Sequence, residues 1–234
     1  MWLMALRIAL RALRRNKLRS FLTMLGIIIG VGAVIAMVAI GEGAKKRVQE
    51  QIAGLGTNLL VVLPGTMTLG GARTGSGGVQ TLVGTDARAI MQEIPVVSLA
   101  SPSLRQVLQV IAADQNWSTV VQGVAPEFQQ IRNWQVEQGR FLSEADVDST
   151  AKVALIGRTV ADNLFGSESP IDAIIRIKKI PFRIIGVLGP KGQTGHGTDQ
   201  DDVVMIPYST MQKRIMGITY VQQIVVSAVS ADKT

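Results

Sequence analysis

The chain contains a single histidine, His196, followed closely by three aspartates, Asp199, Asp201 and Asp202. An imidazole beside carboxylates can ligate a metal ion or act as a general base. The acids lack the D-x-[DN]-x-[DN]-G spacing of a calcium loop, and no G-x-S-x-G sequence supplies a serine nucleophile. Because His196 lies among glycines in the segment 192–197, a solvated loop explains these residues better. We expect no catalytic and no metal-binding residue.

A glycine-rich stretch, with seven glycines from Gly65 to Gly84, has the composition of a phosphate-binding loop. Neither this stretch nor any other part of the sequence has the G-x-x-x-x-G-K-[ST] pattern that cradles the phosphates of a nucleotide. The stretch therefore predicts an irregular loop, and we expect no cofactor. The lack of cysteine also excludes disulfides, thiolate metal sites and a cysteine nucleophile.

Two tryptophans and two acids complete the set of candidate side chains. Trp117 and Trp134 each follow an asparagine at the end of an expected strand. A buried indole fills a core well, and an exposed one could instead form a partner surface, so both alternatives stay open. Glu144 and Asp146 lie in an acidic segment without a catalytic pattern, and we expect both carboxylates to be solvated.

The first element that would position these residues is a membrane span. Residues 21–40 read FLTMLGIIIGVGAVIAMVAI, without a charge, and a helix of this length matches the ~30 Å hydrocarbon core of a bilayer. Its large apolar side chains favour insertion by about 3 to 7 kcal/mol. A cleaved signal peptide usually has an apolar stretch of only about 7–15 residues. A buried helix of a soluble domain rarely needs so long an uncharged run, so we predict a transmembrane helix over 20–40.

The net charge of +7 is concentrated before this span. Residues 1–19 contain six basic residues and no acid, so the rest of the chain is nearly neutral and nucleic-acid binding is not expected. By the positive-inside rule, residues 1–19 lie in the cytoplasm. Apolar residues and arginines fall on opposite faces of a helix there. This predicts an interfacial helix whose arginines contact the inner leaflet, namely Arg7, Arg11, Arg14 and Arg15.

Two glycines within the predicted span, Gly26 and Gly30, stand four residues apart. Small residues at this spacing let another transmembrane helix approach closely. The motif is short and arises often by chance. It predicts packing of this helix against spans that the sequence does not contain.

After the span, the sequence predicts a helical stalk over 41–56 and a mixed α/β domain over 57–234, so the fold class is α+β. Thr85 is expected to cap a helix over 86–94, and a hairpin of 175–178 and 182–185 is expected to turn at 179–181. Other helices are expected at 126–132, 159–165 and 209–216. Strands are expected at 57–63 (buried), 96–100, 106–112, 118–124, 134–137, 152–156, 203–206 and 223–229.

The order of these pieces resembles the MacB-like permeases of ABC transporters and their periplasmic core domain, within the FtsX-like permease group. The segments RRNKLRSFLTMLGIIIGVGAVIAMVAIGEGAK and LGTNLLVVLPG are similar to the first span, stalk and strand of that family. Further similar segments follow in the family's order: NWST, VQGV, RNWQVEQGRFLSEAD, KVALIG, NLFG, PFRIIGVLGPKGQ, DQDDVVMIPYST and IVVSA. One departure is Asp172, where the family usually has glycine, which puts the local turn in question.

The resemblance implies the N-terminal part of a permease in the bacterial inner membrane, with residues 41–234 in the periplasm. Its periplasmic domain would have two lobes, the outer one inserted at roughly 100–150. The implied partners are the membrane, an ABC ATPase, a periplasmic adaptor protein and a second permease copy in a homodimer. ATP-driven motion would export substrate from the periplasm through the adaptor and an outer-membrane duct. The family has three further spans, so the sequence resembles a truncated permease.

Other classes of function remain open at this stage. An FtsX-like regulatory module would control a periplasmic partner such as a cell-wall hydrolase, and a lipoprotein-release permease would share much of the same sequence pattern. A membrane-tethered enzyme would have to use His196, the only histidine. Neighbouring genes distinguish the first two from an exporter, because an ATPase with an adaptor indicates efflux and a hydrolase indicates regulation.

Overall fold

The computed structural model describes residues 2, 4, 7, 17–55, 59–65, 68–69, 72–73, 80–194 and 197–229. Its contacts divide the chain into two compact units, Met1–Glu50 and Gln51–Thr234. The first unit is helical and the second is a mixed β-sheet with short helices. This combination confirms the expected α+β class with one long apolar helix before it.

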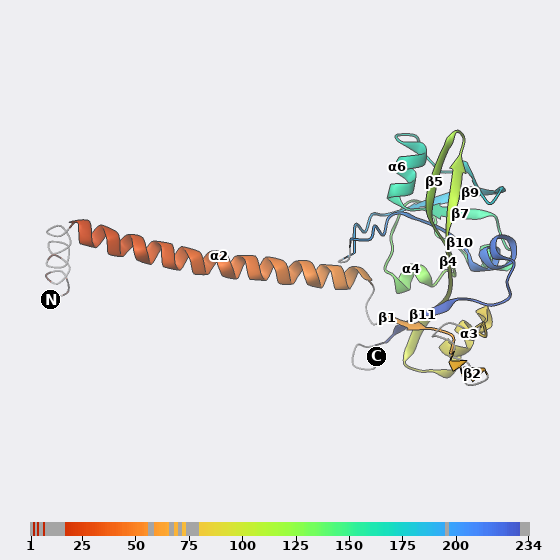
Figure 1. The fold of residues 1–234 in the computed structure, drawn as a ribbon, viewed down its shortest axis with the longest axis horizontal. Helices are drawn as coiled ribbons and strands as arrows, with labels where there is room; N and C mark the ends of the chain where they lie inside the picture. Colours follow the sequence, from red (N-terminus) through yellow and green to blue (C-terminus); the bar gives the residue numbers. More distant parts are fainter. Residues whose placement is uncertain are drawn as a thin grey trace. The chain divides into compact units, whose positions relative to one another are not determined.

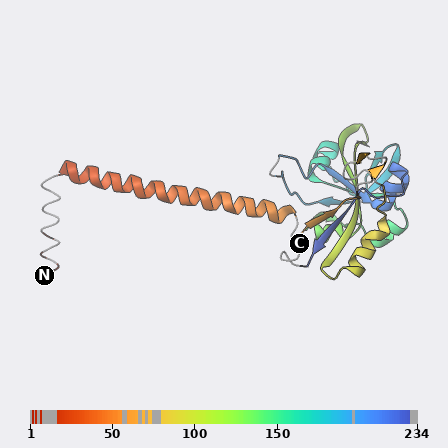
Figure 2. The ribbon, with the colours of Figure 1, turned by 60° about the horizontal axis from the view of Figure 1, so that its bottom comes forward.

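One uninterrupted helix, α2 (Lys17–Leu55), runs through the predicted span and the predicted stalk (Figure 1, Figure 2). Its 39 residues extend about 58 Å, well beyond the ~30 Å of a bilayer core. The part Lys17–Lys46 is long and apolar enough to cross a membrane, with a mean hydropathy of 2.6 and no buried residue. A helix that is apolar on all sides suits lipid, whereas a helix on a soluble core has one apolar stripe.

The second unit contains a nine-stranded sheet built mainly from neighbours that are far apart in the sequence. The order along its main path is β1 (Leu59–Val62), β11 (Gln223–Ala228), β4 (Val97–Ala112), β5 (Gln115–Val124), β10 (Val203–Pro207), β7 (Val153–Ile156), β9 (Ile180–Leu188) and β6 (Val136–Gly139). The ninth strand, β8 (Ile174–Ile177), pairs with β4 and β9. A separate small hairpin joins β2 (Thr68–Leu69) to β3 (Ala72–Arg73).

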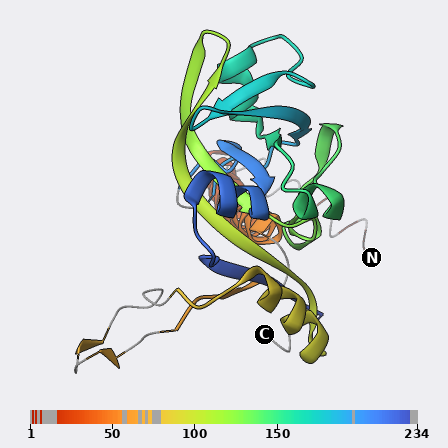
Figure 3. The ribbon, with the colours of Figure 1, turned by 90° about the vertical axis from the view of Figure 1, so that its right-hand side faces the viewer.

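Strand β4 is a single curved strand of 16 residues, where the sequence predicts two strands at 96–100 and 106–112 (Figure 3). The prediction of two strands was wrong, because residues 101–105, including Pro102, continue the strand. Residues up to Ser103 pair with β11, and β5 pairs only from Leu104 onward. Pro102 thus lies where one edge of β4 has no strand beside it, a position at which a strand tolerates a missing N–H.

Six strands close into a hydrogen-bonded ring, whose order in space is β4–β5–β10–β7–β9–β8. Strand β8 closes the ring, because it pairs with both β9 and β4. The interior holds fully buried side chains, among them Leu104, Ile156, Ile177, Phe182 and Ile206. Helix α6 (Arg158–Phe165) packs its apolar residues into the same cluster. Alternation along each strand explains the arrangement, since every second side chain faces the ring interior.

A second apolar cluster covers the outer face of β7, β9 and β10. It contains Phe128 of the short helix α4 (Phe128–Ile131), together with Trp134 and Phe141, packed with Leu155 and Met205. Strands β7 and β10 are therefore buried on both faces, in agreement with their uninterrupted apolar sequences.

Several expected elements differ in detail from those found. Helix α3 (Gly84–Glu93) is capped at Val83, whose N–H donates to the Asp86 carboxylate at 2.8 Å, so Thr85 lies inside the helix. The expected helix 209–216 is a turn of α7 (Tyr208–Thr210) followed by the π-helix η1 (Met211–Met216). Strand β1 is not buried as predicted, since it is the edge strand of the sheet and Leu60 and Val61 are exposed.

The hairpin β8–β9 turns at Lys178 and Lys179 instead of at 179–181. Both lysines have positive φ, 48° and 68°, as a two-residue turn with the twist of the flanking strands requires. This turn pairs Ile177 with Ile180 and keeps Ile177 in the ring interior. The apolar partners fix the register although lysine is poorly suited to this backbone conformation.

Asp172, whose local turn the sequence left in question, adopts a left-handed backbone conformation. Its φ is 63°, in the left-handed region, and its N–H donates to the Ile184 carbonyl at 2.9 Å. Its carboxylate lies 3.4 Å from Arg183, but this ion pair is exposed and contributes little. The turn therefore forms at the expense of backbone strain that glycine would avoid.

Replacing Asp172 by glycine should raise the free energy of unfolding by about 0.5–1 kcal/mol, because the strain of the left-handed conformation is relieved. The matched change Asp172→Ala should lower it, since alanine lacks a polar side chain that tolerates this region. Urea unfolding of the purified chain in detergent measures both. A lower unfolding midpoint for Asp172→Gly than for Asp172→Ala would contradict this account.

Candidate functional site

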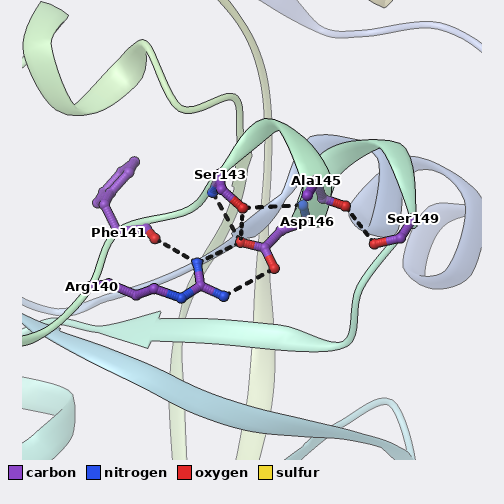
Figure 4. A network of polar contacts seen from close by, with 6 residues as sticks. All are labelled: Arg140, Phe141, Ser143, Ala145, Asp146 and Ser149. Carbon is purple, nitrogen blue, oxygen red and sulfur yellow. Dashed lines mark hydrogen bonds and ion pairs between the residues drawn. The ribbon is translucent and has the colours of Figure 1, made fainter.

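The best-connected polar group of the second unit surrounds the short helix α5 (Glu144–Asp148) (Figure 4). Arg140 donates two hydrogen bonds to the Asp146 carboxylate, at 2.6 and 3.2 Å, and a third to the Phe141 carbonyl at 2.9 Å. The backbone N–H and hydroxyl of Ser143 donate to the same carboxylate at 2.9 and 2.7 Å. This set of bonds fixes the start of α5.

The prediction that Asp146 is solvated was wrong. Its side chain is only 11% exposed, and the Arg140 hydrogen bond, aided by Ser143, lowers the pKa of this carboxyl to about 2 against the opposing effect of burial. Glu144, by contrast, is exposed and lies 3.5 Å from Arg88. The spacing S-x-x-D of Ser143 and Asp146 is a capping box, a pattern that could have revealed the interaction in the sequence.

This interaction network connects the turn before α5 to the sheet. A Cβ atom at Gly139, whose φ is 80°, would lie 2.2 Å from the Ile185 carbonyl oxygen, so only glycine fits there. On the other side of α5, the Ser209 hydroxyl donates to the Val147 carbonyl. Arg140 and Asp146 thus fix the segment 140–146, which packs against β9 through Gly139 and is followed by the bond from Ser209 to Val147, and their role is structural.

The three aspartates after His196 bind groups of the protein itself. Asp201 is buried and accepts from the N–H groups of Lys191 and Gly192 at 2.7 and 2.9 Å. Asp199 accepts from the Thr159 hydroxyl at 2.6 Å. Their oxygens stabilise the loop between β9 and β10, and among the described residues no group of three or more His, Asp or Glu side chains could hold a metal. His196 itself lies outside the described residues.

Both candidate tryptophans donate their indole N–H within the domain. Trp117 donates to Asp202 at 2.8 Å and is half-buried against the interior of the ring. Trp134 is 5% exposed and donates to the Gly189 carbonyl at 2.9 Å. The sequence placed both residues at the ends of strands, and the structure puts them on different apolar clusters.

A cleft of about 430 Å³ opens where β4 changes partners from β11 to β5. Strands β1 and β11 contribute Leu59, Val61 and Val225 to its lining, and the sheet and α4 contribute Val120 and Phe128. Its polar lining comes from separate segments, with Arg105 on β4, Gln122 on β5, Arg132 and Trp134 after α4, and residues 198–200 of the loop before β10. The sequence analysis did not predict this cleft, because no motif spans these segments.

Positive charges accumulate at one side of this cleft. Burial lowers the pKa of the Arg132 guanidinium, and the charge of Arg105 lowers it further. Burial likewise lowers the pKa of Lys191 to about 8, with a contribution from Arg132 and an opposing one from Asp201. The Lys191 ammonium donates to the Arg132 carbonyl and lies 5.1 Å from the Trp134 ring centroid. The three cations are thus close enough to disfavour one another's charge, and one of them, Lys191, lies against the Trp134 ring.

The predicted membrane-associated residues fall on the first unit. Gly26 and Gly30 lie on α2, and no heavy atom lies within 4 Å of a Cβ built at either position. Arg7 is helical and exposed, whereas Arg11, Arg14 and Arg15 lie outside the described residues. The roles of these residues in helix packing and inner-leaflet contact stay predictions.

Solved structures with this fold are extracytoplasmic domains of transporters. The periplasmic region of MacB from Actinobacillus actinomycetemcomitans aligns with a TM-score of 0.62 at 23% identity, covering 78% of this chain and 81% of that one. The extracellular domain of the noncanonic ABC-type transporter YknZ from Gram-positive bacteria aligns with a TM-score of 0.56 at 18% identity, covering 65% and 75%. The second unit therefore shares the fold of these extracytoplasmic transporter domains.

A family model for the MacB-like periplasmic core domain matches residues 20–234, and the chain belongs to this family. It is 42% identical over 233 residues to the macrolide export ATP-binding/permease protein MacB of Syntrophobacter fumaroxidans, and 43% identical over 225 residues to that of Chlorobaculum tepidum. These alignments cover 98% and 96% of this chain but 33% and 34% of the relatives. The chain thus spans about a third of the length of these relatives, as a permease segment bearing the periplasmic core domain.

Asp146→Asn should remove a contribution to the free energy of unfolding that exists only while the carboxyl is ionised. Because the folded-state pKa of Asp146 is depressed, its contribution is present above about pH 4 and is lost as the pH falls toward 2. The substitution should lower the free energy of unfolding by about 2 kcal/mol at pH 7 and have little effect at pH 2. Urea unfolding at several pH values measures this, with Glu144→Gln as the exposed control. An equal loss at pH 7 and pH 2 would refute the assignment.

Proposed function

We propose that this chain is the N-terminal part of a MacB-type ABC transporter permease, whose periplasmic domain transmits ATP-driven motion to export substrate from the periplasm. The observation that carries the proposal is the match to the MacB-like periplasmic core domain together with an apolar helix that precedes it. The partners proposed with it are an ABC ATPase, a periplasmic adaptor, a second permease copy and the inner membrane. The relatives named as macrolide exporters make a macrolide the first substrate to test.

The continuity of α2 supports a mechanical role. Because every backbone N–H in a helix interior is bonded to the preceding turn, a long helix transmits a displacement at one end to the other. In this proposal residues 20–40 cross the membrane and 41–56 act as a stalk, with residues 1–19 on the inner leaflet through Arg7, Arg11, Arg14 and Arg15. Gly26 and Gly30 would let a neighbouring span approach α2 closely.

The folded domain supports a role in binding partners and not in chemistry. The strongest polar network, Arg140 with Asp146, is engaged in holding α5, and the aspartates near the cleft bind loop groups. We propose that ATP hydrolysis takes place on another chain or domain. Contact with an adaptor is proposed for the outer lobe at roughly 100–150, with the half-buried Trp117 as its candidate partner residue, whereas the buried Trp134 belongs to the core.

The absence of cysteine makes the proposed orientation directly testable. In intact spheroplasts, a membrane-impermeant maleimide should label Asp114→Cys, in the exposed turn between β4 and β5, but not Lys17→Cys at the start of α2. After lysis both variants should be labelled. Labelling of Lys17→Cys from outside, with protection of Asp114→Cys, would reverse the topology and exclude a periplasmic domain.

A proline in the stalk should uncouple transport from ATP hydrolysis. Lys45→Pro removes the N–H that bonds to the preceding turn of α2 and costs about 3 kcal/mol in a helix interior, so the helix kinks or breaks there. In the full-length permease with its ATPase, export should fall at least about tenfold while ATP hydrolysis persists. The control Lys45→Ala preserves the helix and should retain export. Normal export by the proline variant would rule out the lever.

A further inference from the structure

We propose that the cleft beside Arg105 and Arg132 binds a small amphiphilic anion, a carboxylate attached to an apolar ring or short chain. Its volume of about 430 Å³ lies within the ~300–1,000 Å³ typical of small-molecule sites. It lies where β4 passes from one partner strand to another, so several separate segments supply its walls. No motif of the sequence marks it.

The anion preference follows from the pairing of the charged groups that line the cleft. These are two arginines and two aspartates, so the sign of the ligand depends on which charges are already satisfied. Asp199 accepts from Thr159 and from the Asp201 N–H, and Asp202 accepts from the Trp117 indole. The Arg105 side chain has no hydrogen-bonding or ion-pair partner anywhere in the described part of the chain. Arg132 donates to Gln200 at 3.2 Å, so among the four charged side chains of the lining Arg105 is the one whose hydrogen-bonding groups are open to a ligand.

Repulsion among the cations adds to this preference. Arg105 lies close enough to Arg132 to disfavour its charged form, and Arg132 acts in the same way on Lys191. A bound carboxylate would relieve the repulsion and could accept two hydrogen bonds from the planar guanidinium of Arg105.

The apolar part of the ligand is specified by the remaining walls. Leu59, Val61, Val120, Phe128 and Val225 provide apolar surface, and Val61 is 46% exposed on the edge strand β1. Burying such surface against a ligand contributes about 25 cal/mol per Å². Inorganic phosphate or another fully polar anion would leave these walls in water, so the site selects a molecule that is apolar at one end.

The test uses the full chain in lipid nanodiscs, with 6-fluoro-2-naphthoate as the probe and fluorine NMR as the readout. We expect saturable broadening of the naphthoate signal beyond that with empty nanodiscs, weaker binding of the neutral 6-fluoro-2-naphthamide, and no saturable binding of inorganic phosphate. Equal affinity for the amide, tighter binding of the matching ammonium compound, or no saturable binding of naphthoate would overturn the proposal. Transport and ATP are absent, so failure here leaves the proposed function intact.

Two substitutions locate the site. Arg105→Gln should weaken naphthoate binding about tenfold, since one charge-assisted interaction is lost, and Val61→Ser should weaken naphthoate and amide alike. The control Arg176→Gln removes another exposed arginine from β8, away from the cleft lining, and should not change the affinity. Circular dichroism confirms that each variant is folded. If Arg105→Gln binds as tightly as the control, the assignment is wrong.

Discussion

The second unit depends on the continuity of strand β4. Its first half is hydrogen-bonded to β11 and its second half to β5 and β8, so one strand of 16 residues belongs both to the small sheet that contains β1 and to the six-stranded ring. Because the backbone of β4 is hydrogen-bonded to neighbouring strands along both halves, these two parts cannot rotate freely about each other. A force applied to the edge with β1 therefore reaches the ring through β4, which is a suitable arrangement for a domain proposed to transmit motion.

The same change of partners produces the cleft. Where β4 leaves β11 and meets β5, the two sheets diverge, and the space between them is lined by side chains from β1, β4, β5 and the segment after α4. The aspartates of the loop before β10 bind groups of the protein itself and so fix the wall of the cleft that this loop forms. Such a rigid environment keeps Arg105 and Arg132 close together despite their repulsion, which is the basis of the proposed anion site.

Much of the architecture follows from the sequence because its causes are local. Twenty uncharged residues after a basic segment predict a span whatever the rest of the chain does, and apolar runs such as 152–156 predict buried strands. The family resemblance also rests on short segments in a fixed order, and the comparison bears it out over residues 20–234. The errors are also physical: two strands were predicted at 96–100 and 106–112, whereas β4 continues through Pro102, because a proline is tolerated where no second strand lies beside it.

The sequence by itself thus determined the apolar helix, the α+β class, the family and the absence of known catalytic motifs, since residue type and spacing are sufficient for each. Tertiary structure alone decided that β8 closes a ring, that Asp146 is paired with Arg140, and that Arg105 and Arg132 share one cleft. The ring and the cleft join residues that are distant in the chain, and the pairing of Asp146 with Arg140 depends on how the turn before α5 folds. Their proximity depends on how strands pair and pack, and no local pattern records that choice.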